Sequence, residues 1–160
     1  MKSIMYHYVQ DFNKEFKNLN ILSFKNFKKQ ISYFKKNFSF FDVHKIFQLS
    51  NINKNNIFLT FDDGLKCHYE VAKFLNNQKL NAIFFIPSID FKNKRILDVH
   101  KIHIILATQK PKLVLDKLKK LGINKYINKK NVSMFKNKLY KKQNNKSQYL
   151  LVKKLLKDRK

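Results

Sequence analysis

Apolar positions along the chain follow two different periods, which together predict alternating strands and helices. Runs of apolar and β-branched residues predict strands, at residues 3–9, 38–43, 57–61 and 82–86. The run at 57–61, Ile-Phe-Leu-Thr-Phe, has no charged residue and is typical of a strand buried on both faces. These runs are the expected framework of a sheet.

Apolar residues spaced three and four apart predict helices, over residues 24–37, 65–76, 98–107 and 111–122. We expect Ser23 to cap the first of these helices, Asp98 to cap the third and Gly122 to end the fourth. A strand, a helix and a strand within about 30 residues form a βαβ unit, which requires parallel strands. The chain is therefore predicted to have an α/β fold.

The last third of the chain has a different pattern. Residues 124–146 are rich in Lys and Asn and only weakly periodic, so we expect a connector or an insertion there. Ser147 is expected to cap a last helix over residues 148–157.

Composition narrows the class of protein. The chain has 160 residues, of which 44% are hydrophobic, enough for a packed core in one domain or part of one. Cys67 is the single cysteine, which excludes a disulfide framework and a cysteine-rich zinc site. Two glycines are too few for a glycine-rich phosphate loop. No apolar run is long enough for a membrane span or resembles a secretory signal, so we expect a cytoplasmic protein.

The net charge of +25 raises the possibility of nucleic-acid binding, because basic surfaces bind phosphates through counterion release. The basic residues are 33 lysines and two arginines, whereas recognition of phosphates and bases favours arginine. The lysines are spread along the chain, and an excess of Lys, Asn, Ile and Phe is typical of AT-rich coding sequences. We therefore do not expect nucleic acid to be the partner.

Polar residues follow the predicted strands at the ends where α/β folds place their sites. Asp62 and Asp63 come directly after the strand at 57–61, and Gly64 permits a turn that lets both side chains reach one site. Adjacent carboxylates repel each other, and a bound cation removes that repulsion. One carboxylate can then bind a metal while the other serves as a base. The alternative is that an aspartate simply caps the next helix, and the two interpretations are compatible because one Asp can do each.

These residues resemble a known family. The segment Phe58-Leu59-Thr60-Phe61-Asp62-Asp63-Gly64 resembles the first motif of the polysaccharide deacetylases, the NodB-homology group or carbohydrate esterase family four. Three further segments are similar to family features, namely Met5 to Val9, Ala82 to Pro87 and Leu97 to His103. The resemblance covers residues 3–107 well and residues 108–160 only loosely, which gives the expected domain division.

The resemblance implies a fold and a reaction. The fold would be part of a distorted (β/α) barrel of the NodB-homology type, followed by a helical C-terminal segment. The reaction would be hydrolysis of N-acetyl groups on amino sugars of a polysaccharide, with a divalent metal, usually zinc. By the same resemblance, Asp62 would be the general base and Asp63 a metal ligand.

The chain departs from the family pattern at its second motif. The family's His-x-x-x-His, which supplies two metal ligands, has no match, and His100 and His103 are three residues apart. These two histidines share a helix face and are candidate ligands beside Asp63, or else ordinary packing residues. His7 is a candidate for lining the substrate site. His44 and His68 are expected at the surface, and Cys67 is not expected to be a nucleophile.

The family's later motifs also have no match, so the chain resembles the N-terminal part of a deacetylase, as in a truncated or split protein. An incomplete barrel exposes strand edges and apolar surface, which a partner chain could cover. A non-catalytic carbohydrate-binding or scaffold remnant is the main alternative function, and a basic nucleic-acid-binding protein is a weaker one.

Overall fold

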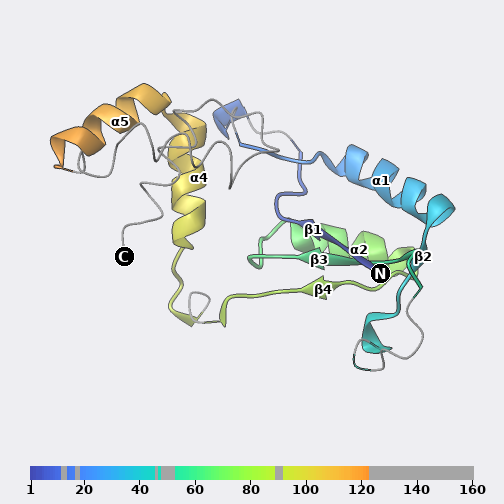
Figure 1. The fold of residues 1–160 in the computed structure, drawn as a ribbon. Coiled ribbons are helices and arrows are strands. Elements are labelled where there is room, and N and C mark those ends of the chain that lie inside the picture. Colours follow the sequence, from blue (N-terminus) through green and yellow to red (C-terminus); the bar gives the residue numbers. More distant parts are fainter. Residues whose placement is uncertain (12–13, 17–18, 46, 48–52, 89–91, 123–160) are drawn as a thin grey trace. The chain divides into compact units, whose positions relative to one another are not determined.

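The computed structural model describes residues 1–11, 14–16, 19–45, 47, 53–88 and 92–122 (Figure 1). The predictions for residues 124–146 and for a helix at 148–157 lie outside this range. Two compact units are present, and each is described by itself. The first comprises residues 1–12 and 20–95, and the second residues 13–19 and 96–160. The expected domain division at residue 107, which rests on family resemblance, stays a prediction.

The first unit is built on a parallel sheet whose central strand is β3 (Asn56–Phe61). Strand β1 (Lys2–Tyr6) pairs along one side of β3, with Tyr6 opposite Phe61. On the other side, β2 (Ser39–Phe40) pairs with the start of β3 and β4 (Ile83–Phe84) with its end. The predicted βαβ unit is confirmed. The predicted strand at 3–9 ends earlier, at Tyr6, and beyond it Val9 makes only an isolated bridge to Leu22.

Two helices belong to the first unit. Helix α1 (Phe24–Asn37) has the predicted bounds, and the hydroxyl of Ser23 accepts a hydrogen bond from the Asn26 amide at 3.2 Å, as a capping serine does. Helix α2 (His68–Asn77) begins three residues later than predicted, because residues 65–67 form the turn that leads into it. There are also two short 3-10 helices in the described residues, η1 (Lys14–Phe16) in the second unit and η2 (Val43–Lys45) in the first.

One face of the sheet packs against both helices. The core of the first unit is a cluster of eight buried side chains, Tyr6, Val9, Phe27, Ile31, Leu59, Phe61, Val71 and Leu75. Strand β3 is nearly covered on its opposite face too, where Thr60 is buried and Phe58 half-buried. Burial raises the pKa of Tyr6 to about 12, so its hydroxyl stays protonated and donates to Oε1 of Gln30 at 2.9 Å.

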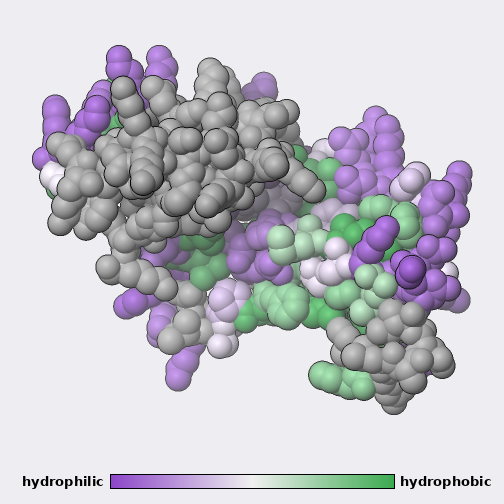
Figure 2. Space-filling view, viewed as in Figure 1, coloured by the Kyte–Doolittle hydropathy of each residue, from purple (hydrophilic) through white to green (hydrophobic). Residues whose placement is uncertain are grey.

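The outer face of α1 is strongly basic. Figure 2 shows hydrophilic side chains over this helix, which carries five exposed lysines, at positions 25, 28, 29, 35 and 36. No acidic residue lies between Phe24 and Asn37. The ammonium group of Lys28 lies 4.7 Å from the ring centre of Phe24, so part of this lysine covers the edge of the core.

The second unit contains α4 (Asp98–Thr108) and α5 (Pro111–Lys120), close to the predicted helices. Asp98 is the first residue of α4 rather than its cap, and its carboxylate accepts a hydrogen bond from Nζ of Lys101 at 2.8 Å. Gly122 ends α5 with φ +74°, a conformation that favours glycine. None of the helices among the described residues is long and apolar enough to cross a membrane. The described residues form a four-stranded parallel sheet, and the expectation that it is part of a distorted (β/α) barrel stays a prediction.

Candidate functional site

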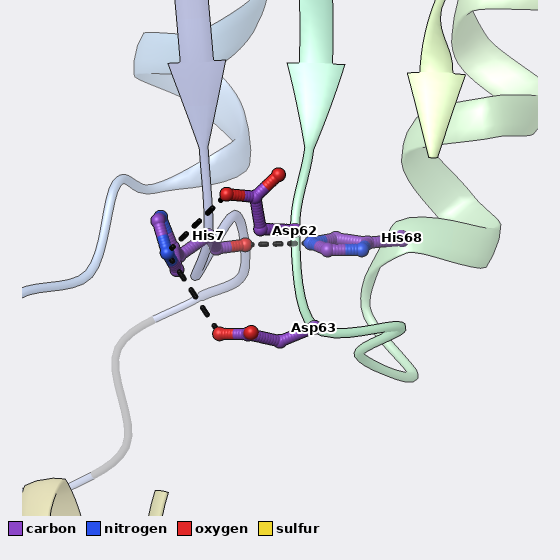
Figure 3. Close-up of polar contacts among 4 residues, drawn as sticks. All are labelled: His7, Asp62, Asp63 and His68. Carbon is purple, nitrogen blue, oxygen red and sulfur yellow. Dashed lines mark hydrogen bonds and ion pairs between the residues drawn. The ribbon is translucent and has the colours of Figure 1, made fainter. Parts of the chain in front are cut away.

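The carboxyl ends of β1 and β3 bring together three residues that the sequence singled out (Figure 3). His7 follows β1, and Asp62 and Asp63 follow β3. Nε2 of His7 lies 4.0 Å from Oδ2 of Asp62 and 3.8 Å from Oδ2 of Asp63. These separations are longer than hydrogen bonds, so the attraction is electrostatic and requires a protonated imidazole. The side chains are 21–37% exposed, which leaves all three accessible to a ligand.

The parallel register of the sheet explains why these residues meet. Since Tyr6 pairs with Phe61, the next residue on each strand, His7 and Asp62, leaves the sheet at the same level. The Asp62 amide donates to the carbonyl of Tyr6 at 3.1 Å, which extends the strand pairing by one bond. The site is therefore a direct consequence of the pairing of β1 with β3.

The turn after β3 contains two residues in the left-handed backbone region. Asp63 and Gly64 both have positive φ, +76° and +58°, a region that aspartate tolerates better than most residues do. Helix α2 then begins at His68, with Cys67 at its cap position and no side-chain capping bond. Neither aspartate occupies the cap position, so the prediction that one of them simply caps this helix is wrong.

Replacing Gly64 with alanine should destabilise the first unit by about 1–3 kcal/mol. An added Cβ would adopt a strained φ and would meet Cγ2 of Ile86 at 3.2 Å. Urea unfolding followed by circular dichroism measures the loss.

Gly122→Ala is the matched control for Gly64→Ala. Gly122 also has a positive φ, but a Cβ added there would meet no atom within 4 Å. We expect a smaller loss, about 1 kcal/mol, from the left-handed backbone conformation alone. Equal losses in the two variants would show that the contact with Ile86 contributes nothing.

Two exposed apolar side chains follow β4 at this end of the sheet. Phe85 and Ile86 are 54% and 61% exposed, and the Phe85 amide donates to the carbonyl of Phe61 at 2.8 Å. The sequence predicts both residues inside the strand at 82–86, whereas β4 ends at Phe84 and leaves them beyond it. Apolar surface therefore lies next to the strand end that carries the carboxylates.

His68 is buried, which contradicts its predicted place at the surface. Only 5% of the residue is exposed, and its Nε2 lies 2.7 Å from the carbonyl oxygen of His7. Burial lowers the pKa of His68, and this effect outweighs the bond to His7 and the nearby Asp63 charge, which both act to raise it. The sequence offered one missed signal, since His68 lies three residues before Val71, on the apolar face of the helix.

His44 matches its prediction, and the expectation for Cys67 stays a prediction. His44 is exposed in η2. Cys67 is half-buried, and burial raises the pKa of its thiol, which favours the unreactive protonated form.

His100 and His103 both lie on α4, in the second unit. Their ring centres are 6.2 Å apart, as expected for residues three apart on one helix face, with His100 buried and His103 half-buried. Asp63 belongs to the first unit, and a metal shared between it and these histidines stays a prediction. Within the described residues, no group of three or more His, Cys, Asp and Glu side chains is arranged to hold a metal ion.

No family model and no curated protein matches the chain. Among solved structures, it is similar to a Streptococcus pyogenes deacetylase, PplD, in complex with acetate. The identity is 16% and the TM-score 0.49, and the similarity covers 96% of this chain and 79% of that one. A similarity this low carries no argument about the function of this chain.

Proposed function

We propose that this protein is a polysaccharide deacetylase-like hydrolase that removes N-acetyl groups from amino sugars. One observation carries the proposal. The Thr60-Phe61-Asp62-Asp63-Gly64 segment, which resembles the family's first motif, lies at the carboxyl end of a parallel strand with both carboxylates accessible. A third polar side chain, His7, lies within 4.0 Å of them. Sites of α/β enzymes form at such strand ends.

Asp62 is proposed as the general base. Its carboxylate is 29% exposed and can accept a proton from a water molecule that attacks the acetamide carbonyl. The C–O bond then forms and the C–N bond breaks, and the proton passes to the leaving nitrogen. The products are acetate and the free amine of the sugar. His7, whose Nε2 lies within 4.0 Å of both carboxylates, is proposed to contact a bound saccharide.

Asp63 is proposed as a ligand of a divalent metal, by resemblance zinc, which would polarise the substrate carbonyl. A carboxylate suits this role in its donor chemistry. The described residues do not form a site with three ligands. His100 and His103 are proposed as the other two ligands. The chemistry of Asp62 is therefore the better supported part of the proposal.

Asp63→Asn should reduce zinc affinity of the whole chain by at least about tenfold, since an amide oxygen carries no charge to attract the cation. Asparagine also tolerates the positive φ of this position, so the turn is retained. Isothermal titration with zinc measures the affinity. Unchanged affinity in the variant would show that Asp63 is not a ligand.

Acetate release from an N-acetylated amino-sugar oligomer tests the function directly. Release that is lost with a chelator and restored by zinc supports the proposal. If the oligomer binds and no acetate is released, with or without zinc, the protein is a non-catalytic carbohydrate-binding module and the proposal fails.

A further inference from the structure

His68 connects the start of α2 to the segment that carries His7. We propose that His68 is a positioning residue, which donates its Nε2–H to the His7 carbonyl and so holds His7 beside Asp62 and Asp63. The inference deepens the proposed function and rests on it for its catalytic consequence. Its structural content can be tested separately.

The hydrogen bond fixes the tautomer of His68. A carbonyl oxygen can only accept, so Nε2 must carry the proton at a separation of 2.7 Å. Nδ1 of the same ring is buried and has no hydrogen-bond partner among the described residues. A second proton on Nδ1 would therefore be a buried donor without an acceptor, which is costly. The neutral Nε2–H form is the one that this environment selects, and it is the form that donates.

The ring of His68 is held in place by aromatic neighbours. Its centre lies 5.4 Å from that of Phe61 and 6.0 Å from that of Phe84, the last residues of β3 and β4. These contacts fix the direction of the Nε2–H bond. Figure 3 shows the ring reaching from α2 across the end of β3 to the His7 backbone.

The carbonyl of His7 needs this donor because regular strand pairing has already ended. Strand β1 stops at Tyr6, whose carbonyl accepts from the Asp62 amide at 3.1 Å. One residue later, the His7 carbonyl accepts from His68 instead. The Tyr6 carbonyl thus accepts from a backbone amide, and the next carbonyl, that of His7, accepts from a side chain. Both donors, Asp62 and His68, follow β3 in the sequence. Beyond His7, the Tyr8 carbonyl accepts from the Leu22 amide at 2.9 Å, so His68 supplies the bond that holds the chain at His7 itself.

The first test is the tautomer of His68 in the wild-type full chain. Long-range ¹H–¹⁵N correlation spectra distinguish the two neutral forms of each histidine ring. We expect His68 as the Nε2–H form, with a slowly exchanging ring proton. An Nδ1–H form could not donate to the carbonyl and would overturn the proposal.

The second test compares His68→Gln with His68→Leu. Glutamine can place an N–H donor near the position of Nε2, whereas leucine restores apolar packing without a donor. If His68 positions His7, the ring resonances of His7 stay close to wild type in His68→Gln and shift in His68→Leu. If His68 only packs, the order is reversed, because the polar amide is then the worse replacement, and that result overturns the proposal. If His68→Leu does not fold, a His68→Gln variant with shifted His7 resonances also overturns it.

His44→Leu is the matched control, since His44 is exposed in the same unit and lies outside the site. This variant should leave the His7 resonances and the rate of acetate release unchanged. Acetate release should fall about 10- to 100-fold in His68→Leu and be largely retained in His68→Gln, because misplaced groups react slowly. If the wild-type chain releases no acetate, the proposed function fails, while the resonances still decide the role of His68.

Discussion

Asp62→Asn should lower the rate of acetate release by about 10²–10⁴-fold, the usual contribution of a general base. Asparagine has nearly the shape of aspartate but cannot accept the proton of the attacking water at neutral pH. The Asp62 amide, which donates to the Tyr6 carbonyl at 3.1 Å, is untouched by this change. The fold should therefore be retained, and the loss should appear in the turnover number more than in saccharide binding. Steady-state kinetics on an N-acetylated amino-sugar oligomer measure both quantities.

Glu70→Gln is the matched control for Asp62→Asn. Glu70 lies on α2 in the same unit, its side chain is 65% exposed, and its replacement removes the same charge. Its rate should stay at the wild-type value. A normal rate in Asp62→Asn, or an equal loss in the two variants, would remove Asp62 from the role of base.

Much of the first unit follows from local sequence signals. The βαβ unit around β3 was predicted because an uncharged run of five residues, a turn with glycine and an apolar helix face occur in succession. The cap at Ser23 was predicted for a similar reason, since its geometry depends on a few neighbouring residues. The meeting of His7 with Asp62 depends on the pairing of β1 with β3, across more than fifty residues of chain. Its prediction needed the rule that parallel strands end at one edge of a sheet, together with the family resemblance.

The errors also have physical causes. His68 was expected at the surface because histidine is often exposed, but a carbonyl one residue beyond β1 provides a buried acceptor that no local pattern reveals. The strand predicted at 3–9 ends at Tyr6 because β3 itself ends at Phe61, so its partner has no further residue to pair with. The sequence around Asp98 has the form of a cap, yet α4 includes that residue and uses it to bind Lys101. Tertiary partners decide the positions of His68 and of the end of β1, and single segments do not show them.

Phe27→Ala should destabilise the first unit by about 3–5 kcal/mol, the usual cost of removing a buried phenylalanine ring. Phe27 is completely buried on α1. Its ring centre lies 5.2 Å from that of Tyr6 and 6.0 Å from that of Phe61. Tyr6 and Phe61 directly precede His7 and Asp62, so the cavity would form under the strand ends that carry the site. Urea unfolding followed by circular dichroism measures the change in stability.

Tyr33→Ala is the control on the same helix. Tyr33 is 57% exposed, and its ring centre lies 5.9 Å from that of Phe34 and 6.4 Å from that of Phe38. Its removal should cost less than about 1 kcal/mol. The difference between the variants would then measure the packing of α1 against the sheet. A loss below about 1 kcal/mol in Phe27→Ala would contradict the packing described for this core, and with it the rigid support under His7 and Asp62.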